Sequence, residues 1–306
     1  MKTVTLGISP LCVSRLAYGC WRLAATPENR VADKRAVIAA YEAGYTLYDH
    51  ADIYGRGEAE IIFGEVLREV PGMRDRIAIL TKAGVRRADD PPGSPYHYNL
   101  SGEHLIRSCE GSLQRLGVGT IDVFLLHRAD WLTDPAEVAA AFLKLKESGK
   151  VKFFGVSNCR SSLVSALQAA CPMPLVTHQV EVSLGQLSTF EDGTLDQCLA
   201  EKMTPLAWSP LGGGQFGDGA KRLLKYQEGY RTADVVPLLD EYAKARGMTR
   251  SALALAWLLK HPSGIVPIVG STNPGRIRDA VSATEAALTR EEWYRLLTAA
   301  RGVPLP

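Results

Sequence analysis

The segment Val123-Phe124-Leu125-Leu126 is apolar at every position, whereas a strand with one face in water alternates apolar and polar residues. A continuous apolar run of this kind is typical of a parallel strand buried on both faces. Similar short runs recur along the chain with helix-like stretches between them, and eight such strands most economically close into a (β/α)8 TIM barrel. The eight predicted strands are residues 16–19, 46–49, 77–81, 122–126, 151–156, 175–179, 204–208 and 265–269.

The stretches between these runs carry recognisable helix ends. Asp134 can accept amide hydrogens of a first turn, Pro135 suits the first helical position, and Glu137 stands where a capping box requires an acid. Gly149 tolerates a left-handed backbone and is expected to end this helix. Two further helices are expected from similar signals, one between Ser101 and Gly117 and one whose apolar stripe (Val37, Ile38, Tyr41) ends at Gly44.

The remaining segments predict how the barrel is closed and where it is open. Residues 4–6 and 11–13 are expected to form a short N-terminal β-hairpin that plugs the bottom of the barrel. Residues 84–100 and 210–231 are too long for ordinary connections, and because both follow strands we expect them at the rim where barrel enzymes carry their sites. A doubly wound open sheet is disfavoured because no GxGxxG follows the first strand. With no internal repeat or linker, residues 1–306 are expected to form a single domain.

Composition and charge exclude several classes of protein. The chain is 46% hydrophobic and 22% charged with a net charge of +2, and no run of like charges suggests binding to nucleic acid or to a membrane surface. The six cysteines are scattered without a CxxC pair, as expected of reduced thiols. We find no signal peptide and no apolar stretch near the roughly 20 residues of a membrane helix, so a soluble cytoplasmic protein is expected.

Four ionisable residues stand at or just after consecutive predicted strands, where a barrel brings strand ends together. Tyr54 is a poor proton donor at its usual pKa of about 10, so a catalytic tyrosine needs a nearby cation to lower that pKa. Lys82 can supply the cation, and Asp49 can keep this lysine charged in a water-poor environment. His127 is then expected to hydrogen-bond the substrate oxygen or to share the proton.

Taken singly, each of these residues has a simpler interpretation. A tyrosine in a glycine-containing loop usually packs, a lysine is usually solvated, and His127 followed by Arg128 can mark a strand that meets water. Together, four compatible residue types at neighbouring strand ends favour a catalytic site.

Serial motifs lie at residues 44–55, Lys82, residues 121–127, residues 155–158 and residues 268–272. In the order and spacing of these motifs, from about Leu16 to Arg290, the chain resembles the aldo-keto reductases. It is similar to a bacterial subgroup marked by Asp-His-Ala-Asp-Ile-Tyr-Gly and by residues 207–214. This resemblance implies a (β/α)8 barrel that reduces an aldehyde or ketone with NADPH, with Tyr54 as general acid and without a metal.

The resemblance also implies where the cofactor binds. Trp208 is expected to stack on the nicotinamide ring, and the backbone of the glycine-rich turn at residues 209–213 is expected to cradle the pyrophosphate, as suits close approach of backbone to phosphate. The residues implied for the carboxamide are Ser157, Asn158 and Gln179, and those implied for the pyrophosphate are Ser209, Pro210, Leu211 and Gly213.

The adenosine end is expected at Gly270, Ser271, Thr272 and Arg276. Two hydroxyls, a helix N-terminus and a guanidinium suit a 2′-phosphate and therefore favour NADPH. NADH is also possible, because this chain has Gly270 where many relatives carry a lysine. A second departure is His50, where many members carry serine or threonine.

The substrate pocket is expected to include Trp21, Tyr54 and His127, with Tyr96, His97 and Tyr98 as weaker candidates. Two other functions stay open. A cofactor-loaded subunit that senses redox state would retain the same four catalytic-type residues. A metal-hydrolase cluster of His50, Asp52, His127 and His178 is disfavoured because no His-x-His element is present.

Overall fold

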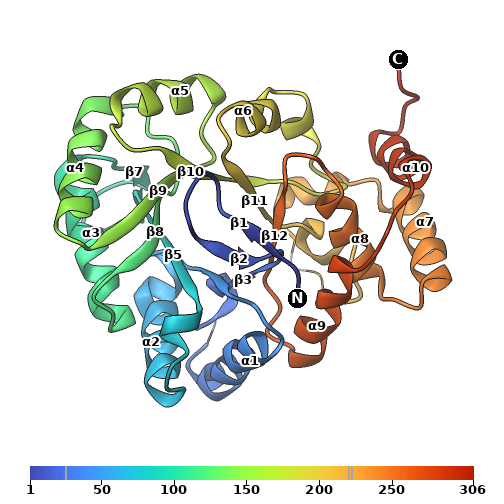
Figure 1. Cartoon of the computed structure of the whole chain (residues 1–306), viewed down its shortest axis with the longest axis horizontal. Helices are drawn as coiled ribbons and strands as arrows, with labels where there is room; N and C mark the ends of the chain where they lie inside the picture. The colour runs from blue at the N-terminus through green and yellow to red at the C-terminus, as the bar shows by residue number, and fades with distance from the viewer. Residues whose placement is uncertain (25, 220, 222) are drawn as a thin grey trace.

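The structure is a computed structural model that describes residues 1–24, 26–219, 221 and 223–306. Its centre is a closed barrel of eight parallel strands that follow one another around the barrel in chain order, as predicted (Figure 1). The strands are β3 (Ala17–Gly19), β4 (Leu47–Asp49), β5 (Ala78–Ala83), β8 (Ile121–Leu126), β9 (Val151–Ser157), β10 (Leu175–Glu181), β11 (Thr204–Trp208) and β12 (Val266–Val269). Every predicted strand is therefore confirmed, with ends that differ by at most two residues.

Helices form a ring around the barrel (Figure 1). Their inner faces pack against the outer faces of the strands in one large apolar core, while a smaller core fills the barrel interior. The helices are α1 (Arg30–Glu42), α2 (Glu58–Glu69), α3 (Gly102–Leu116), α4 (Pro135–Glu147), α5 (Ser161–Ala170), α6 (Thr194–Ala200), α7 (Thr232–Ala245), α8 (Arg250–Leu259), α9 (Pro274–Asp279) and α10 (Arg290–Arg301). In the part of the chain that is described, no helix has the length and hydrophobicity required to cross a bilayer.

The ends of α4 agree with those predicted from the sequence, except for the role of Glu137. Asp134 caps the helix by accepting the Ala136 amide at 2.9 Å, and Gly149 has a left-handed φ of 71° beyond its other end. The expected capping box is wrong, because the Glu137 carboxylate accepts the Gly102 amide at 2.8 Å. Gly102 begins α3, whose first amide groups lack partners within their own helix and attract a carboxylate.

The predicted N-terminal hairpin is confirmed as β1 (Thr3–Thr5) paired antiparallel with β2 (Cys12–Ser14). It lies at the amino-terminal ends of the barrel strands, because Gly7 donates to the Thr204 hydroxyl at 2.8 Å and Ser14 donates to the Thr46 hydroxyl at 2.7 Å. Leu6 and Val13 belong to the core inside the barrel. The hairpin therefore plugs the bottom of the barrel.

The two long rim segments contain short elements of their own. Residues 84–100 form a small hairpin of β6 (Val85–Arg86) and β7 (His97–Tyr98). Residues 210–231 include the 3-10 turns η6 (Gly212–Gly214) and η7 (Lys225–Gly229), and two of the predicted loop residues, 220 and 222, lie outside the described residues. Five cysteines are buried, whereas Cys12 in the hairpin is exposed.

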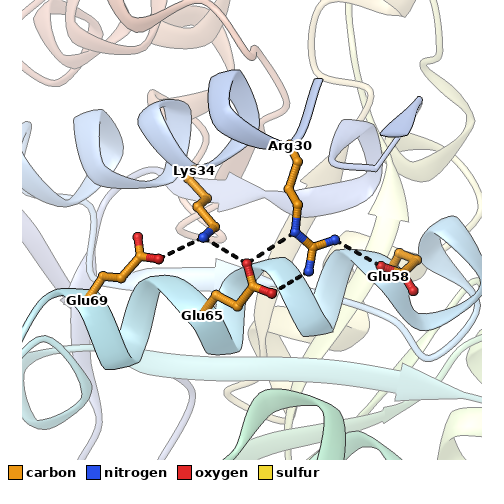
Figure 2. Close-up of polar contacts among 5 residues, drawn as sticks. All are labelled: Arg30, Lys34, Glu58, Glu65 and Glu69. Carbon is orange, nitrogen blue, oxygen red and sulfur yellow. Dashed lines mark hydrogen bonds and ion pairs between the residues drawn. The ribbon is translucent and has the colours of Figure 1, made fainter. Parts of the chain in front are cut away.

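An ion-pair network joins α1 and α2 on the outside of the barrel (Figure 2). Lys34 lies 2.8 Å from Glu65 and 2.7 Å from Glu69. Arg30 pairs with Glu65 and reaches Glu58 at 3.2 Å. Glu65 is thus shared by both cations, and these contacts cause a marked fall in its pKa, to about 2. The network ties together the two helices that flank the Tyr54 segment.

Candidate active site

The four residues predicted to carry the chemistry meet at the carboxyl ends of neighbouring strands. Asp49 is the last residue of β4, Lys82 lies near the end of β5, and His127 follows β8. Tyr54 lies in the 3-10 turn η3 (Tyr54–Gly57), which connects β4 to α2. The fold therefore brings together four side chains that are up to 78 positions apart in the numbering, from 49 to 127.

Lys82 and Asp49 form a buried ion pair. The Lys82 Nζ lies 2.6 Å from Asp49 Oδ1 and donates a second hydrogen bond of 2.7 Å to the carbonyl of His50. Asp49 Oδ1 also accepts the side-chain amide of Gln179 at 2.6 Å. Burial lowers the pKa of Lys82, and the Coulombic attraction and hydrogen bond of Asp49 oppose that fall. Asp49 therefore acts on the lysine in the direction predicted from the sequence.

Tyr54 is held against this pair by its own loop. The Asp52 amide donates to the Lys82 carbonyl at 3.0 Å, and Gly55 and Gly57 have φ values of 55° and 92° that let the chain turn back over the strand ends. As a result, Lys82 Nζ lies 5.1 Å from the centre of the Tyr54 ring. The His127 ring meets the same phenol edge-on, with 5.9 Å between ring centres.

The proton affinity of Tyr54 differs from the prediction. Burial raises the pKa of Tyr54 well above 10, and the negative charge of Asp49 adds to the rise. The predicted fall in pKa is therefore not observed in the protein alone. The physical reason is that desolvation penalises the phenolate and the negative charge of Asp49 opposes its formation. Tyr54 is consequently a neutral phenol at physiological pH, which is the protonation state of a proton donor.

His127 is also neutral. Burial lowers the pKa of His127 well below 6.5, and the positive charges of Lys82 and Arg128 lower it further. Its Nδ1 is buried with no hydrogen-bond partner among the described residues. A neutral imidazole can donate a hydrogen bond to a substrate oxygen, but it carries no spare proton to share.

The residues predicted for the nicotinamide end form one hydrogen-bonded cluster. Asn158 donates to the Ser157 hydroxyl at 2.6 Å and accepts the Trp208 indole N–H at 2.9 Å. Asn158 has a φ of 53°, a left-handed conformation that orients its side chain toward both neighbours. Gln179 lies on the adjacent strand β10 and directs its amide at Asp49. This cluster is thereby linked to the catalytic-type residues.

The predicted pyrophosphate turn is tightly folded. Ser209 and Gly213 have φ values of 51° and 67°, and the Gly213 amide donates to the Ser209 hydroxyl at 3.1 Å. The side chain of Gln227 donates to the same hydroxyl at 3.1 Å. Pro210 and Leu211 lie in the turn between Ser209 and Gly213. Because the Gly213 amide donates to Ser209, one of the predicted phosphate donors already has a partner within the turn.

The predicted adenosine end lies where β12 leads into α9. Asn273 caps that helix by accepting the Arg276 amide at 3.1 Å, and the Tyr18 hydroxyl donates to the Ser271 carbonyl at 3.2 Å. Thr272 is exposed, and a Cβ at Gly270 would meet no atom within 4 Å. The Arg276 guanidinium reaches the rim segment, where it lies 2.9 Å from the place that a Cβ at Gly219 would occupy.

The predicted pocket residues beyond Tyr54 and His127 lie further out on the rim. Trp21 is in the 3-10 turn η1 (Cys20–Arg22), which packs against η3, and its side chain is 57% exposed. Tyr96 and Tyr98 pack edge-on against each other, and His97 contacts the carbonyl of Pro95 at 2.8 Å. These residues lie in the segments that follow β3 and β5.

Two charged residues of this region were not predicted as site residues from the sequence. Arg128, interpreted as a strand end, lies over the Trp208 ring with 5.5 Å between its guanidinium carbon and the ring centre. Glu181 is the buried last residue of β10 and accepts hydrogen bonds from Tyr226 at 2.5 Å and from Gln227 at 2.8 Å. Its position at the end of a barrel strand could have marked Glu181 as a site residue. Its hydrogen-bond partners lie in the long rim segment, whose conformation was not predicted from the sequence.

The residues of the metal-hydrolase alternative do not converge. His50 packs edge-on against Phe63 with 4.5 Å between ring centres, and His178 accepts the Cys159 amide at 3.3 Å. Among the described residues, no three histidine, cysteine or acidic side chains are grouped so that they could hold a metal ion.

Comparisons with known proteins identify the family of this chain. The model of the Aldo/keto reductase family matches residues 15–300. A 6-dehydroglucose reductase of Novosphingobium aromaticivorans is 39% identical over 98% of this chain and 96% of that protein. A second 6-dehydroglucose reductase, of Agrobacterium fabrum, is 39% identical over 95% of each chain, and the oxidoreductase YdhF of Escherichia coli is 37% identical over 96% of this chain and 95% of its own.

The fold is also shared with a solved enzyme. The crystal structure of a thermostable aldo-keto reductase in complex with the inhibitor epalrestat superposes with a TM-score of 0.83 and 25% identity, over 98% of this chain and 100% of that one. The chain therefore belongs to the aldo/keto reductase family and is an NAD(P)H-dependent oxidoreductase.

Proposed function

We propose that this protein reduces an aldehyde or ketone to an alcohol with NADPH and that Tyr54 donates the proton. The observation that carries the proposal is the position of the Tyr54 phenol, which lies between the Lys82 ammonium at 5.1 Å and the His127 ring at 5.9 Å. Burial keeps this phenol protonated by raising its pKa well above 10. A neutral donor is thus available where the strand ends meet.

The rim residues fit NADPH. Arg276 forms no ion pair with another described residue, and the space beside Gly270 is open. Together with the hydroxyls of Ser271 and Thr272, this free guanidinium suits a phosphate monoester. NADH would leave the guanidinium without its phosphate, so we propose a preference for NADPH.

The nicotinamide end would be held by the asparagine cluster described above. The amide groups of Asn158 and Gln179 match the donor and acceptor of a carboxamide, and the Trp208 indole offers a flat apolar face. The glycine-rich turn would hold the pyrophosphate by its backbone, and the Gly213 amide would then exchange the Ser209 hydroxyl for a phosphate oxygen. When bound, NADPH supplies the hydride that reduces the carbonyl carbon.

The protein's own residues act on the carbonyl oxygen. Tyr54 transfers its hydroxyl proton to this oxygen as negative charge develops there, and the neutral His127 ring donates a hydrogen bond to the same oxygen. The Lys82 ammonium stabilises the phenolate that Tyr54 becomes, while Asp49 keeps the ammonium in place and protonated. The phenolate then regains a proton, because burial makes it a strong base.

The names of two relatives suggest a substrate to test first. Both are named 6-dehydroglucose reductase, so we propose a polar aldehyde of sugar size among the substrates. The segments that follow β3 and β5 carry the exposed aromatic residues Trp21 and Tyr96, which can pack against a sugar ring.

The test is the Tyr54→Phe variant, with Tyr41→Phe on α1 as a matched control. We expect Tyr54→Phe to bind NADPH as tightly as the wild type, by quenching of tryptophan fluorescence, while kcat for a panel of aldehydes falls by roughly 10²–10⁴-fold. Tyr41→Phe should behave as the wild type. Near-normal turnover by Tyr54→Phe would refute the assignment of the proton donor.

The same panel separates reduction from redox sensing. Stopped-flow mixing of the NADPH-loaded wild type with aldehydes and ketones, 6-dehydroglucose included, follows the loss of cofactor absorbance in a single turnover. Rapid oxidation by at least one carbonyl supports the proposal. Negligible oxidation by every compound would favour a cofactor-bound sensor.

A further inference from the structure

We infer that Arg128 binds an anionic group of the substrate, so that the preferred substrates are aldehydes or ketones that also carry a carboxylate, sulfonate or phosphate. The inference rests on the proposed function, and it extends that function by naming the chemical class of the substrate and the residue that recognises it.

The position of Arg128 places its charge at the mouth of the barrel. It directly follows His127, and its guanidinium lies over the Trp208 ring with 5.5 Å to the ring centre. Its positive charge opposes the rise in the pKa of Tyr54 and of Tyr226 in the second long rim segment, and it adds to the fall in the pKa of His127. The guanidinium therefore lies between the proton donor and the rim, where the remainder of a substrate has to extend.

Arg128 has no anionic partner of its own. It makes no hydrogen bond or ion pair with another described residue. The carboxylates of the surroundings are already engaged: Asp49 accepts from Lys82, Asp130 accepts the backbone amides of Leu100 and Leu132, and Glu181 accepts from three side chains. A partly buried guanidinium is thus left with its donors free.

Stacking on Trp208 preorganises the Arg128 guanidinium for binding an anion. An arginine side chain in water loses considerable rotamer freedom when it binds a ligand, but a guanidinium already stacked on an aromatic ring loses less. Its planar edge presents paired N–H groups that match the oxygens of a carboxylate, sulfonate or phosphate. By contrast, the neighbouring rim arginine Arg87 is occupied, because it donates to the carbonyl of Ile53 at 2.5 Å.

Substrates that differ only in charge test the inference. We compare 4-carboxybenzaldehyde and 4-formylbenzenesulfonate with the neutral 4-formylbenzamide, using the wild type, Arg128→Gln and Arg128→Lys. The wild type is expected to prefer the two anions by about tenfold or more in kcat/KM, mainly through KM. Arg128→Gln should abolish this preference, and Arg128→Lys should retain part of it. A preference for only one of the two anions would identify which oxyanion is recognised.

A matched control separates the site from the general charge of the rim. Arg160 also stacks on an exposed indole, that of Trp131, at 5.4 Å, yet its loop does not carry a catalytic-type residue. Arg160→Gln should therefore keep the preference for anions. If Arg160→Gln and Arg128→Gln reduced the preference equally, the inference of a specific site would be overturned.

A binding measurement makes the test independent of turnover. By calorimetry on the NADP⁺-loaded protein, 4-(hydroxymethyl)benzoate should bind about tenfold more tightly than 4-(hydroxymethyl)benzamide, and Arg128→Gln should remove the difference. Equal binding of the two alcohols would overturn the inference, as would weaker NADPH binding by Arg128→Gln with an unchanged substrate preference. If no aldehyde were reduced, the proposed function would fail, while calorimetry would still decide whether Arg128 selects an anion.

Discussion

The Lys82 ammonium and the Asp49 carboxylate lie 2.6 Å apart with both side chains buried. Removing either partner leaves an uncompensated buried charge, so we expect Lys82→Met and Asp49→Leu each to lower the free energy of unfolding by about 3–5 kcal/mol. The double variant should be more stable than either single variant, because it leaves neither charge. Urea denaturation followed by circular dichroism measures all three, and a double variant less stable than both single variants would contradict this account.

The pH dependence of the two reaction directions should differ. Because burial raises the pKa of Tyr54 well above 10, the phenol stays protonated and kcat for carbonyl reduction should remain level between about pH 6 and about pH 9. Alcohol oxidation needs the phenolate as a base and should therefore accelerate with rising pH over the same range. Steady-state profiles in both directions measure this, and a reduction rate that halves near pH 7 would argue against Tyr54 as the donor.

The buried ring of His50 should make the protein less stable in acid. Both of its nitrogens lack partners among the described residues, and burial lowers its pKa to about 3. The folded state then binds fewer protons than the unfolded state between about pH 3 and about pH 6.5, so stability falls as pH decreases through this window. Asp52 acts in the opposite sense, because burial raises its pKa to about 7.

His50→Leu tests this account because Asp52 is common to both proteins. Relative to the wild type, the variant should gain about 2 kcal/mol of stability when the pH is lowered from 7 to 5, since the unfolded wild type gains a proton that the folded wild type does not accept. Thermal denaturation at the two pH values provides the measurement. A stability difference that does not change with pH would contradict this account, because it would show that His50 has the same pKa in the folded and unfolded states.

The network between α1 and α2 should contribute modestly and in a salt-dependent way. Glu65 pairs with both Arg30 and Lys34 (Figure 2), so Glu65→Gln should cost about 1 kcal/mol at low ionic strength and clearly less in 1 M salt. Glu69→Gln, which removes a single pair, is the matched comparison and should cost less. An equal loss of stability for both variants at low salt would show that the sharing of Glu65 by two cations adds no stability.

The fold could be predicted closely because its signals are local. A run such as residues 123–126 requires burial on both faces wherever it lies, and helix caps such as Asp134 depend only on nearby amide groups. Glu137 was misjudged because its partner, the Gly102 amide, belongs to another helix. A contact of this kind, between two helices of different barrel units, carries no local signal in the sequence.

The site could be predicted in its residues but not in its electrostatics. Strand ends in a barrel converge, so Asp49, Lys82 and Tyr54 could be grouped from their positions alone. The direction of the Tyr54 pKa shift depends on how far water is excluded and on how the charges of Asp49 and Lys82 balance at the phenol. Neither quantity can be predicted from the spacing of residues in the sequence. Arg128 was overlooked for a similar reason, because it stacks on Trp208, a residue 80 positions away in the sequence, from 128 to 208.

The N-terminal hairpin has a consequence for how the chain is made. It emerges from the ribosome before the barrel strands, yet Gly7 bonds to Thr204 across 197 positions, and Leu6 and Val13 share the barrel interior with Ile268 of the last strand. The hairpin residues must therefore wait for the last barrel strand before their apolar side chains are covered. Contacts of such long range slow folding and leave the nascent chain exposed to aggregation, so we expect newly synthesised protein to depend on chaperones more than the stability of the finished barrel would suggest.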